Sequence, residues 1–146
     1  MKSSVIYTAI LATTLLGSAS AFAADDAGAR FTATLDGASE APGPGDPDGM
    51  GTATIRVNPG REQVCYSITV SMIGAATAAH IHEAPVGQPG PVVVRGIMPP
   101  SNGTSQGCVP VSRELAKEII KNPGDYYVNV HNAQFPGGAV RGQLGK

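Results

Sequence analysis

The sequence of 146 residues predicts an all-β protein, an antiparallel β-sandwich that contains one short helix. Three observations support this fold class. Short runs that alternate apolar and polar residues recur along the chain and are rich in β-branched and aromatic residues. The 19 glycines and 12 prolines fall mainly between these runs, as turn signals. The net charge of −1 favours a folded domain over the disorder that so many glycines and prolines otherwise indicate.

Residues 1–23 have the features of a secretory signal peptide. Lys2 precedes an apolar run over residues 5–16, and small residues then lead to Ala21-Phe22-Ala23, a pattern that signal peptidase prefers. We therefore expect a mature domain over residues 24–146 in a periplasmic or secreted location. The alternative is that the apolar run is retained as an anchor, although it is shorter than the roughly 20 residues of a membrane span.

The first half of the mature domain contains three predicted strands and two connections. The strands are expected at residues 31–35, 52–57 and 63–72. In the third strand, the residues predicted to face the core are Val64, Tyr66, Ile68 and Val70. Residues 36–49 are rich in glycine, proline and acidic residues and are predicted as a loop, and Asn58-Pro59-Gly60 is predicted as a turn.

The second half contains the remaining strands and the helix. The strands are expected at residues 79–83, 92–98, 105–111, 126–132 and 139–144. The helix is predicted between Ser112, a suitable N-cap, and Asn122-Pro123-Gly124, a stop signal. Its apolar stripe consists of Leu115, Ile119 and Ile120.

Two cysteines, Cys65 and Cys108, occur in the whole sequence. An oxidising compartment tends to pair the cysteines of an exported domain, so we expect a disulfide. Closing a loop of this length stabilises a fold by about 4 kcal/mol in the chain-entropy model. The alternatives are two buried thiols or a cysteine ligand of a soft metal.

The three histidines are the strongest candidates for a functional site. His80 and His82 lie on one face of a predicted strand, because side-chain direction alternates, whereas Ile81 points to the core. In the later strand, Val128 and Val130 share the core face, so His131 is expected to face outward. If the two strands are neighbours, the three imidazoles converge.

Convergent imidazoles are suitable ligands for copper, with zinc as the alternative. Ring nitrogens near one shared centre would favour a metal site, and affinity is then expected to fall as the pH drops through about 6.5, where free imidazoles take up protons. The competing interpretation is that His80, His82 and His131 are solvated residues on a β surface and bind no metal.

Other classes of function receive little support from the sequence. The basic residues are scattered, which argues against nucleic-acid binding. The chain contains no G-x-S-x-G and no nucleotide-binding glycine motif, so no residue is predicted to be catalytic and a non-enzymatic protein is expected. Asp46-Pro47-Asp48-Gly49 lacks the remaining spacing of a calcium loop and is predicted to be a solvated turn.

Two blocks of sequence closely resemble the hallmark blocks of the CHRD (chordin) domain. They are His80 to Val94 and Tyr127 to Leu144, the second of which contains PGGAVRGQL. The segment Phe31 to Gly37 with Glu40, and the strand Gly51 to Ile55, resemble the opening of that domain. The resemblance implies an Ig-like β-sandwich of the kind found in exported bacterial proteins and repeated in chordin, an extracellular binder of growth factors. The positions that match its motifs are His80, His82, Asn129, His131 and Arg141.

A weaker resemblance links the sequence to Cu/Zn superoxide dismutase, another β-sandwich with an internal disulfide. The His80-Ile-His-Glu83 segment and the later Val128-Asn-Val-His131 segment are similar to its copper-ligating strands. The paired metal site of that enzyme needs more histidines than the three of this chain, so its mechanism is excluded. A single copper site on a related β-sandwich is compatible with three histidines.

The sequence therefore supports two kinds of function. The first is an exported copper-binding protein with His80, His82 and His131 as ligands, which stores, buffers or hands on the ion. The second, by analogy with chordin, is an extracellular protein-interaction module without a metal.

Overall fold

A computed structural model describes residues 28–145 of the chain. The predicted signal peptide, residues 1–23, lies outside the described residues. The strands are β1 (Ala29–Asp36), β2 (Met50–Asn58), β3 (Gln63–Ser71), β4 (Ala76–Glu83), β5 (Val92–Ile97), β6 (Thr104–Pro110), β7 (Tyr126–Asn132) and β8 (Val140–Gln143). The helix α1 (Arg113–Lys121) and a 3₁₀ turn, η2 (Pro123–Asp125), connect β6 to β7. All the predicted strands and the predicted helix are present, whereas η2 was not expected.

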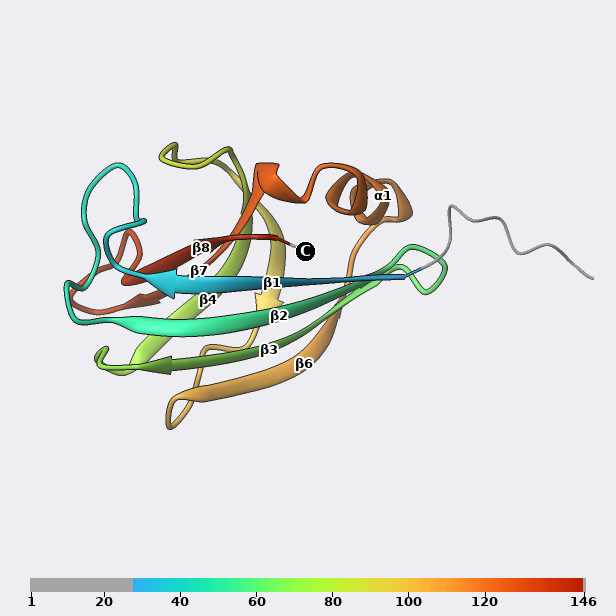
Figure 1. The fold of residues 1–146 in the computed structure, drawn as a ribbon. Coiled ribbons are helices and arrows are strands. Elements are labelled where there is room, and N and C mark those ends of the chain that lie inside the picture. The colour runs from blue at the N-terminus through green and yellow to red at the C-terminus, as the bar shows by residue number, and fades with distance from the viewer. Residues whose placement is uncertain (1–27, 146) are drawn as a thin grey trace, which may run out of the picture.

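The strands form one antiparallel sheet in the order β5-β4-β7-β8-β1-β2-β3-β6. The sheet is narrow where β1 meets β8, because the pairing there consists of Asp36 with Arg141 and an isolated bridge between Thr32 and Gly145. This joint divides the sheet into an open half, β1-β2-β3-β6, and a histidine half, β5-β4-β7-β8 (Figure 1). The end strands β5 and β6 also contact each other, so the sheet nearly closes into a barrel.

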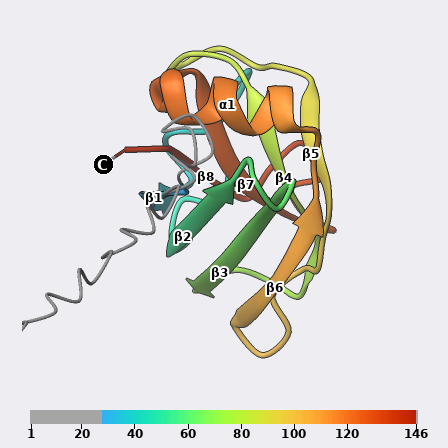
Figure 2. The same cartoon turned by 90° about the vertical axis from the view of Figure 1, so that its right-hand side faces the viewer.

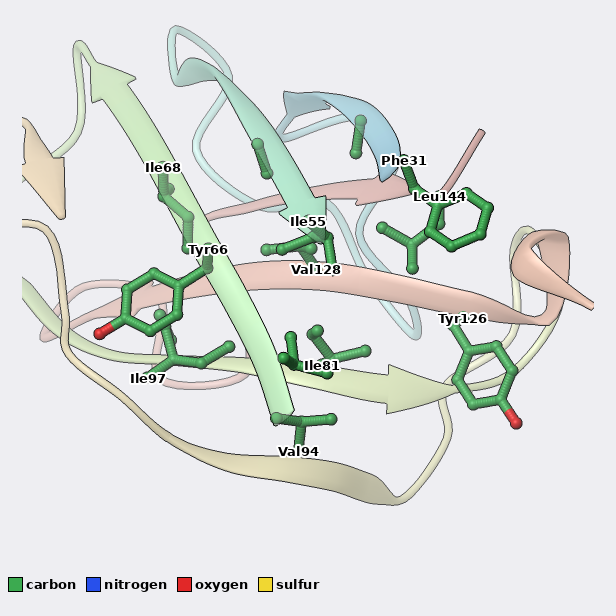
Figure 3. Close-up of a cluster of buried hydrophobic side chains, with 14 of the residues drawn as sticks. Phe31, Ile55, Tyr66, Ile68, Ile81, Val94, Ile97, Tyr126, Val128 and Leu144 are labelled. Atoms are coloured by element: carbon green, nitrogen blue, oxygen red, sulfur yellow. The ribbon is translucent and has the colours of Figure 1, made fainter. Parts of the chain in front are cut away.

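The hydrophobic core lies between the two halves. Figure 3 shows Ile55, Tyr66 and Ile68 from the open half together with Ile81 and Val128 from the histidine half. The four residues of β3 that were predicted to face the core are all buried, which confirms the alternation. The all-β fold with one short helix is thus confirmed.

Helix α1 lies beside one end of this core (Figure 2). Ser112 caps it as predicted, because its hydroxyl accepts a hydrogen bond of 3.1 Å from the Leu115 N–H. Ile119 is fully buried, and Leu115 and Ile120 pack against the core from partly exposed positions.

The predicted disulfide joins Cys65 of β3 to Cys108 of β6, which are directly opposite each other in the antiparallel register. The bridge therefore fixes one edge of the open half to its neighbouring strand.

The described residues include no helix that is long and apolar enough to cross a membrane.

The loop between β1 and β2 differs in part from the solvated turn that was predicted. Asp48 is exposed, but Asp46 is buried, and its backbone N–H donates to the Ala139 carbonyl at 2.8 Å. The Asp46 carboxylate in turn accepts a bond of 3.3 Å from the Asp48 N–H. The loop therefore packs against the connection between β7 and β8, a tertiary contact that turn residues alone do not reveal.

Candidate functional site

The two strands that carry the histidines are neighbours in the sheet. In the register of β4 and β7, His80 is opposite Asn129 and Ala78 is opposite His131. One ring nitrogen from each of His80, His82 and His131 can be chosen so that all three lie within 4.8 Å of one another. The shortest contact joins His80 Nδ1 to His131 Nε2 at 3.2 Å. The predicted convergence of the three imidazoles is therefore present.

The histidine-bearing face is less solvated than the alternation predicted. His82 is 9% exposed and Asn129 is 2% exposed, while His80 and His131 are partly exposed. The three histidines lie on the face opposite Ile81, Val128 and Val130, as expected, but His82 is covered there rather than solvated. The segment after β4, residues 84–91, folds back over this face of the sheet, which periodicity along a strand cannot reveal.

Side chains of β4 and β7 hold one end of this loop. His82 Nδ1 donates to the Gly90 carbonyl at 2.8 Å, and the Gly90 N–H donates to the Tyr127 hydroxyl at 3.2 Å. The Tyr127 ring stacks on the His82 ring, with 4.8 Å between centroids. The orientation of the His82 ring is thus fixed by both a hydrogen bond and a stacking contact.

Side chains of β8 hold the rest of the loop. The Arg141 guanidinium donates to the Gln88 carbonyl at 2.8 Å and to the Pro85 carbonyl at 3.1 Å. It also lies 3.4 Å from the centroid of the Tyr127 ring, in a cation–π contact. Gln143 Nε2 donates to the Ala84 carbonyl at 2.7 Å. These contacts offset the cost of burying the Arg141 guanidinium.

The hydrogen bonds of the imidazoles determine which nitrogens can bind a metal. His131 Nδ1 lies 3.0 Å from the Pro136 carbonyl, and His82 Nδ1 contacts the Gly90 carbonyl. A carbonyl oxygen only accepts, so both Nδ1 atoms carry protons and both Nε2 atoms have free lone pairs. His82 Nε2 is buried. The Asn129 amide interacts with this ring, but among the described residues no contact to Nε2 has the geometry of a full hydrogen bond.

His80 completes the set through its Nδ1 atom. Because His131 Nε2 is an acceptor, His80 Nδ1 donates to it when no metal is bound. Moving the His80 proton to Nε2 would free the Nδ1 lone pair toward the same centre. Metal-ligating histidines typically donate their second ring N–H to a carbonyl, and this arrangement is present at His82 and His131.

The environment keeps the imidazoles uncharged. Burial lowers the pKa of His80 to about 4, and the neighbouring His131, His82 and Arg95 add to this effect. Burial also lowers the pKa values of His82 and His131 from their usual value. Neutral imidazole is the form that binds a metal, so the cluster is in its ligating form at neutral pH.

The spacing of the cluster suits one small metal ion after a modest adjustment. In a tetrahedral site with bonds of 2.0–2.1 Å, the ligand nitrogens lie roughly 3.4 Å apart. The contact between His80 and His131 already has this spacing, whereas the widest separation among the three nitrogens, 4.8 Å, needs side-chain rotation. Three imidazoles would leave a fourth position open for another ligand.

Several residues of this face were not singled out as functional by sequence reasoning. Tyr127 shares the face of Asn129 and His131 through the period of two, and Gln143 shares that of Arg141. A run of polar side chains at alternate positions of two strands was the available signal. The identity of their partners, the carbonyls of residues 84–91, depends on tertiary folding.

The comparisons with known proteins give one family. The model of the CHRD domain matches residues 31–144, which include all eight strands from Phe31 of β1 onward. No curated protein and no solved structure matches the chain. The matched region contains His80, His82 and His131 as well as the disulfide, and both the family and the disulfide are typical of secreted modules. The chain belongs to the CHRD domain family.

Proposed function

We propose that this CHRD domain is an exported, non-enzymatic copper-binding protein and that His80, His82 and His131 hold a single ion. This proposal rests mainly on the convergence of the three histidines, which have nitrogens within 4.8 Å of one another. Two of the rings are oriented by backbone carbonyls, and His82 Nε2 is buried with no contact of full hydrogen-bond geometry from residues 28–145. A buried acceptor without a partner is costly, and a bound cation would remove this cost.

Copper is favoured over zinc by the donor set. The cluster contains imidazoles alone, and divalent copper binds such ligands more tightly than zinc does. His80 and His131 are partly exposed, so an ion can reach the site from solvent and leave it again. This accessibility suits a protein that stores, buffers or hands on copper. Export to the periplasm or beyond rests on the predicted cleavage after Ala23 and on the disulfide.

The same geometry also supports a second candidate. Without a metal, His80 and His131 satisfy each other by a direct hydrogen bond, so the cluster can also be a structural element of an extracellular interaction module. Metal affinity distinguishes the two functions, because a module without a metal would bind copper no better than scattered surface histidines do.

The test is calorimetric titration of the mature protein with Cu²⁺ and, separately, Zn²⁺. We expect copper to bind with a stoichiometry of one, each of His80→Ala, His82→Ala and His131→Ala to weaken binding at least about tenfold, and the triple variant to abolish it. Asp48→Asn is the control, because Asp48 is an exposed residue of the β1–β2 loop. Failure of the wild-type protein to bind either ion more tightly than about micromolar would overturn the proposal in favour of the interaction module.

A further inference from the structure

The outer face of the open half carries a row of two arginines and the disulfide. Arg30 of β1 is opposite Arg56 of β2, Arg56 is opposite Cys65 of β3, and Cys65 is opposite Cys108 of β6. All four residues line one cavity of about 600 Å³. A second cavity of about 360 Å³ shares Arg30, Arg56 and Cys65 and adds Arg61. We call these two cavities together the arginine groove.

The arginine groove is a positive surface that the sequence did not predict. The basic residues were expected to be scattered, but the pairing of β1 with β2 places Arg30 directly against Arg56. No Asp or Glu is among the described residues that line either cavity. Two like charges directly opposite each other repel, and no acidic side chain among these lining residues offsets them. The groove therefore has a positive field that attracts anions.

The disulfide in this groove joins two residues that differ in exposure and in their neighbours. Cys108 is exposed on the edge strand β6, whereas Cys65 is partly buried on β3. Gln63 Nε2 donates to Cys65 Sγ at 3.2 Å, and Arg56 is the register neighbour of Cys65. A hydrogen-bond donor and a nearby guanidinium both stabilise a thiolate on Cys65.

We propose that the arginine groove admits small anionic thiols and that the Cys65–Cys108 disulfide undergoes thiol–disulfide exchange with them. The external thiolate attacks Cys108 Sγ, because Cys108 is the more exposed of the two residues and lies on the edge strand. A new S–S bond forms between the external sulfur and Cys108, the Cys65–Cys108 bond breaks, and its electron pair leaves on Cys65 as a thiolate. Attack by a second thiolate on the external sulfur releases the external disulfide and the Cys108 thiolate.

The arginines and Gln63 act on different parts of this step. The arginine field raises the local concentration of an anionic thiol and lowers that of a cationic one. The Gln63 amide stabilises the leaving thiolate whatever the charge of the attacking thiol. The exchange takes place on the open half and does not depend on the histidine cluster or on a bound metal.

The test compares three thiols of different charge on the folded protein. Glutathione is the anionic probe, 2-mercaptoethanol the neutral one and cysteamine the cationic one, and initial rates are normalised to the thiolate concentration of each. Products are trapped with acid, and the modified cysteine is identified by peptide mass spectrometry. We expect the rate to increase linearly with thiol concentration, glutathione to react fastest and cysteamine slowest, and the first adduct to lie on Cys108.

Three variants separate the contributions. Arg30→Gln combined with Arg56→Gln is expected to slow glutathione about tenfold and to reduce the difference between the three thiols. Gln63→Leu is expected to slow all three thiols by a similar factor. Arg95→Gln, which removes an exposed arginine from β5 that lines neither cavity, is the matched control and is expected to leave the rates unchanged.

Three outcomes would overturn the proposal. Equal rates for the three thiols in the wild-type protein would show that the groove does not select by charge. A first adduct on Cys65 would contradict the direction of attack. A rate that is independent of thiol concentration would show that reduction follows unfolding of the domain rather than attack on the folded state.

Discussion

The two halves of the sheet use their outer faces differently. In the open half, buried and exposed residues alternate, as in β3, where every second residue from Val64 to Val70 is buried. In the histidine half, β7 is buried on both faces, and His131 is the one residue of that strand that is not fully buried. The difference arises because residues 84–91 cover the histidine half, whereas the outer face of the open half is exposed. A polar side chain therefore loses its hydration on the covered face of the histidine half, whereas it keeps contact with solvent on the open half.

Each polar group that is buried on the histidine half needs a partner that offsets the cost of its desolvation. Arg141 and Gln143 offset the cost of desolvation by binding loop carbonyls. His82 Nε2 and Asn129 Oδ1 are buried and have no contact of full hydrogen-bond geometry among the described residues. The Asn129 amide interacts with the His82 ring, and a bound cation would satisfy His82 Nε2 directly. On the open half a polar atom without a protein partner is solvated, so it carries no comparable cost.

Removal of Arg141 is expected to have the largest effect on the free energy of unfolding. Comparing it with removal of an exposed arginine tests the difference between the two halves. Arg141→Ala leaves the Pro85 and Gln88 carbonyls without their donor and removes the contact with Tyr127. We expect a loss of about 3–4 kcal/mol in the free energy of unfolding, measured in urea. Arg56→Ala on the open half is the control and is expected to change stability by less than about 0.5 kcal/mol. Equal effects of the two variants would contradict the distinction between the halves.

The disulfide is the second largest contribution, and it belongs to the open half. Cys65→Ser combined with Cys108→Ser removes a bridge between residues 43 positions apart in the sequence. We expect a loss of about 2–4 kcal/mol in urea unfolding, mainly because the unfolded chain regains the freedom of the closed loop. A loss below about 0.5 kcal/mol would mean that the bridge contributes almost nothing to the folded state.

The sequence predicted much of the fold because the open half obeys simple local rules. The alternation in residues 63–72 gave the core face of β3, and Ser112 marked the start of α1. The same alternation placed His80 and His82 on one face, and neighbouring strands then brought His131 to them. It could not reveal that this face is covered, since the folding back of residues 84–91 is a long-range event. Nor could it reveal the pairing of Arg30 with Arg56, which are 26 positions apart.

Metal affinity should depend on pH differently from that of free imidazoles. The sequence alone predicted a loss of affinity through about pH 6.5, but burial lowers the pKa of His80 to about 4 and lowers those of His82 and His131. Protons therefore compete with copper only at lower pH. We expect affinity to be nearly constant from pH 7.5 to 6 and to decrease as the pH approaches 4, as measured by copper titration at each pH. A midpoint of the loss near pH 6.5 would indicate solvated imidazoles.

The smallest expected effect concerns Glu40, in the loop that packs against the β7–β8 connection. Burial raises the pKa of Glu40 from 4.5 to about 7, with the positive charge of Arg141 opposing this shift and Asp36 adding to it. Between pH 4.5 and 7 the unfolded chain has an ionised Glu40 and the folded chain a protonated one, so the contribution of this residue to stability decreases as the pH rises. Glu40→Gln removes this titration and keeps the shape. We therefore expect the variant to gain stability relative to the wild type between pH 5 and pH 8, as measured by urea unfolding.

The difference between Glu40→Gln and the wild type reports on one carboxyl group, in the loop between β1 and β2. The histidines also make stability depend on pH, because their pKa values differ between the folded and the unfolded chain, but they are present in both proteins and their contribution cancels in the difference. Asp48→Asn removes an exposed carboxylate from the same loop and is the matched control. The buried Oε1 of Glu40 has no hydrogen-bond partner among the described residues, which makes its ionised form costly. If Glu40→Gln and the wild type had the same dependence of stability on pH, Glu40 would be as well solvated as the exposed residues of the open half.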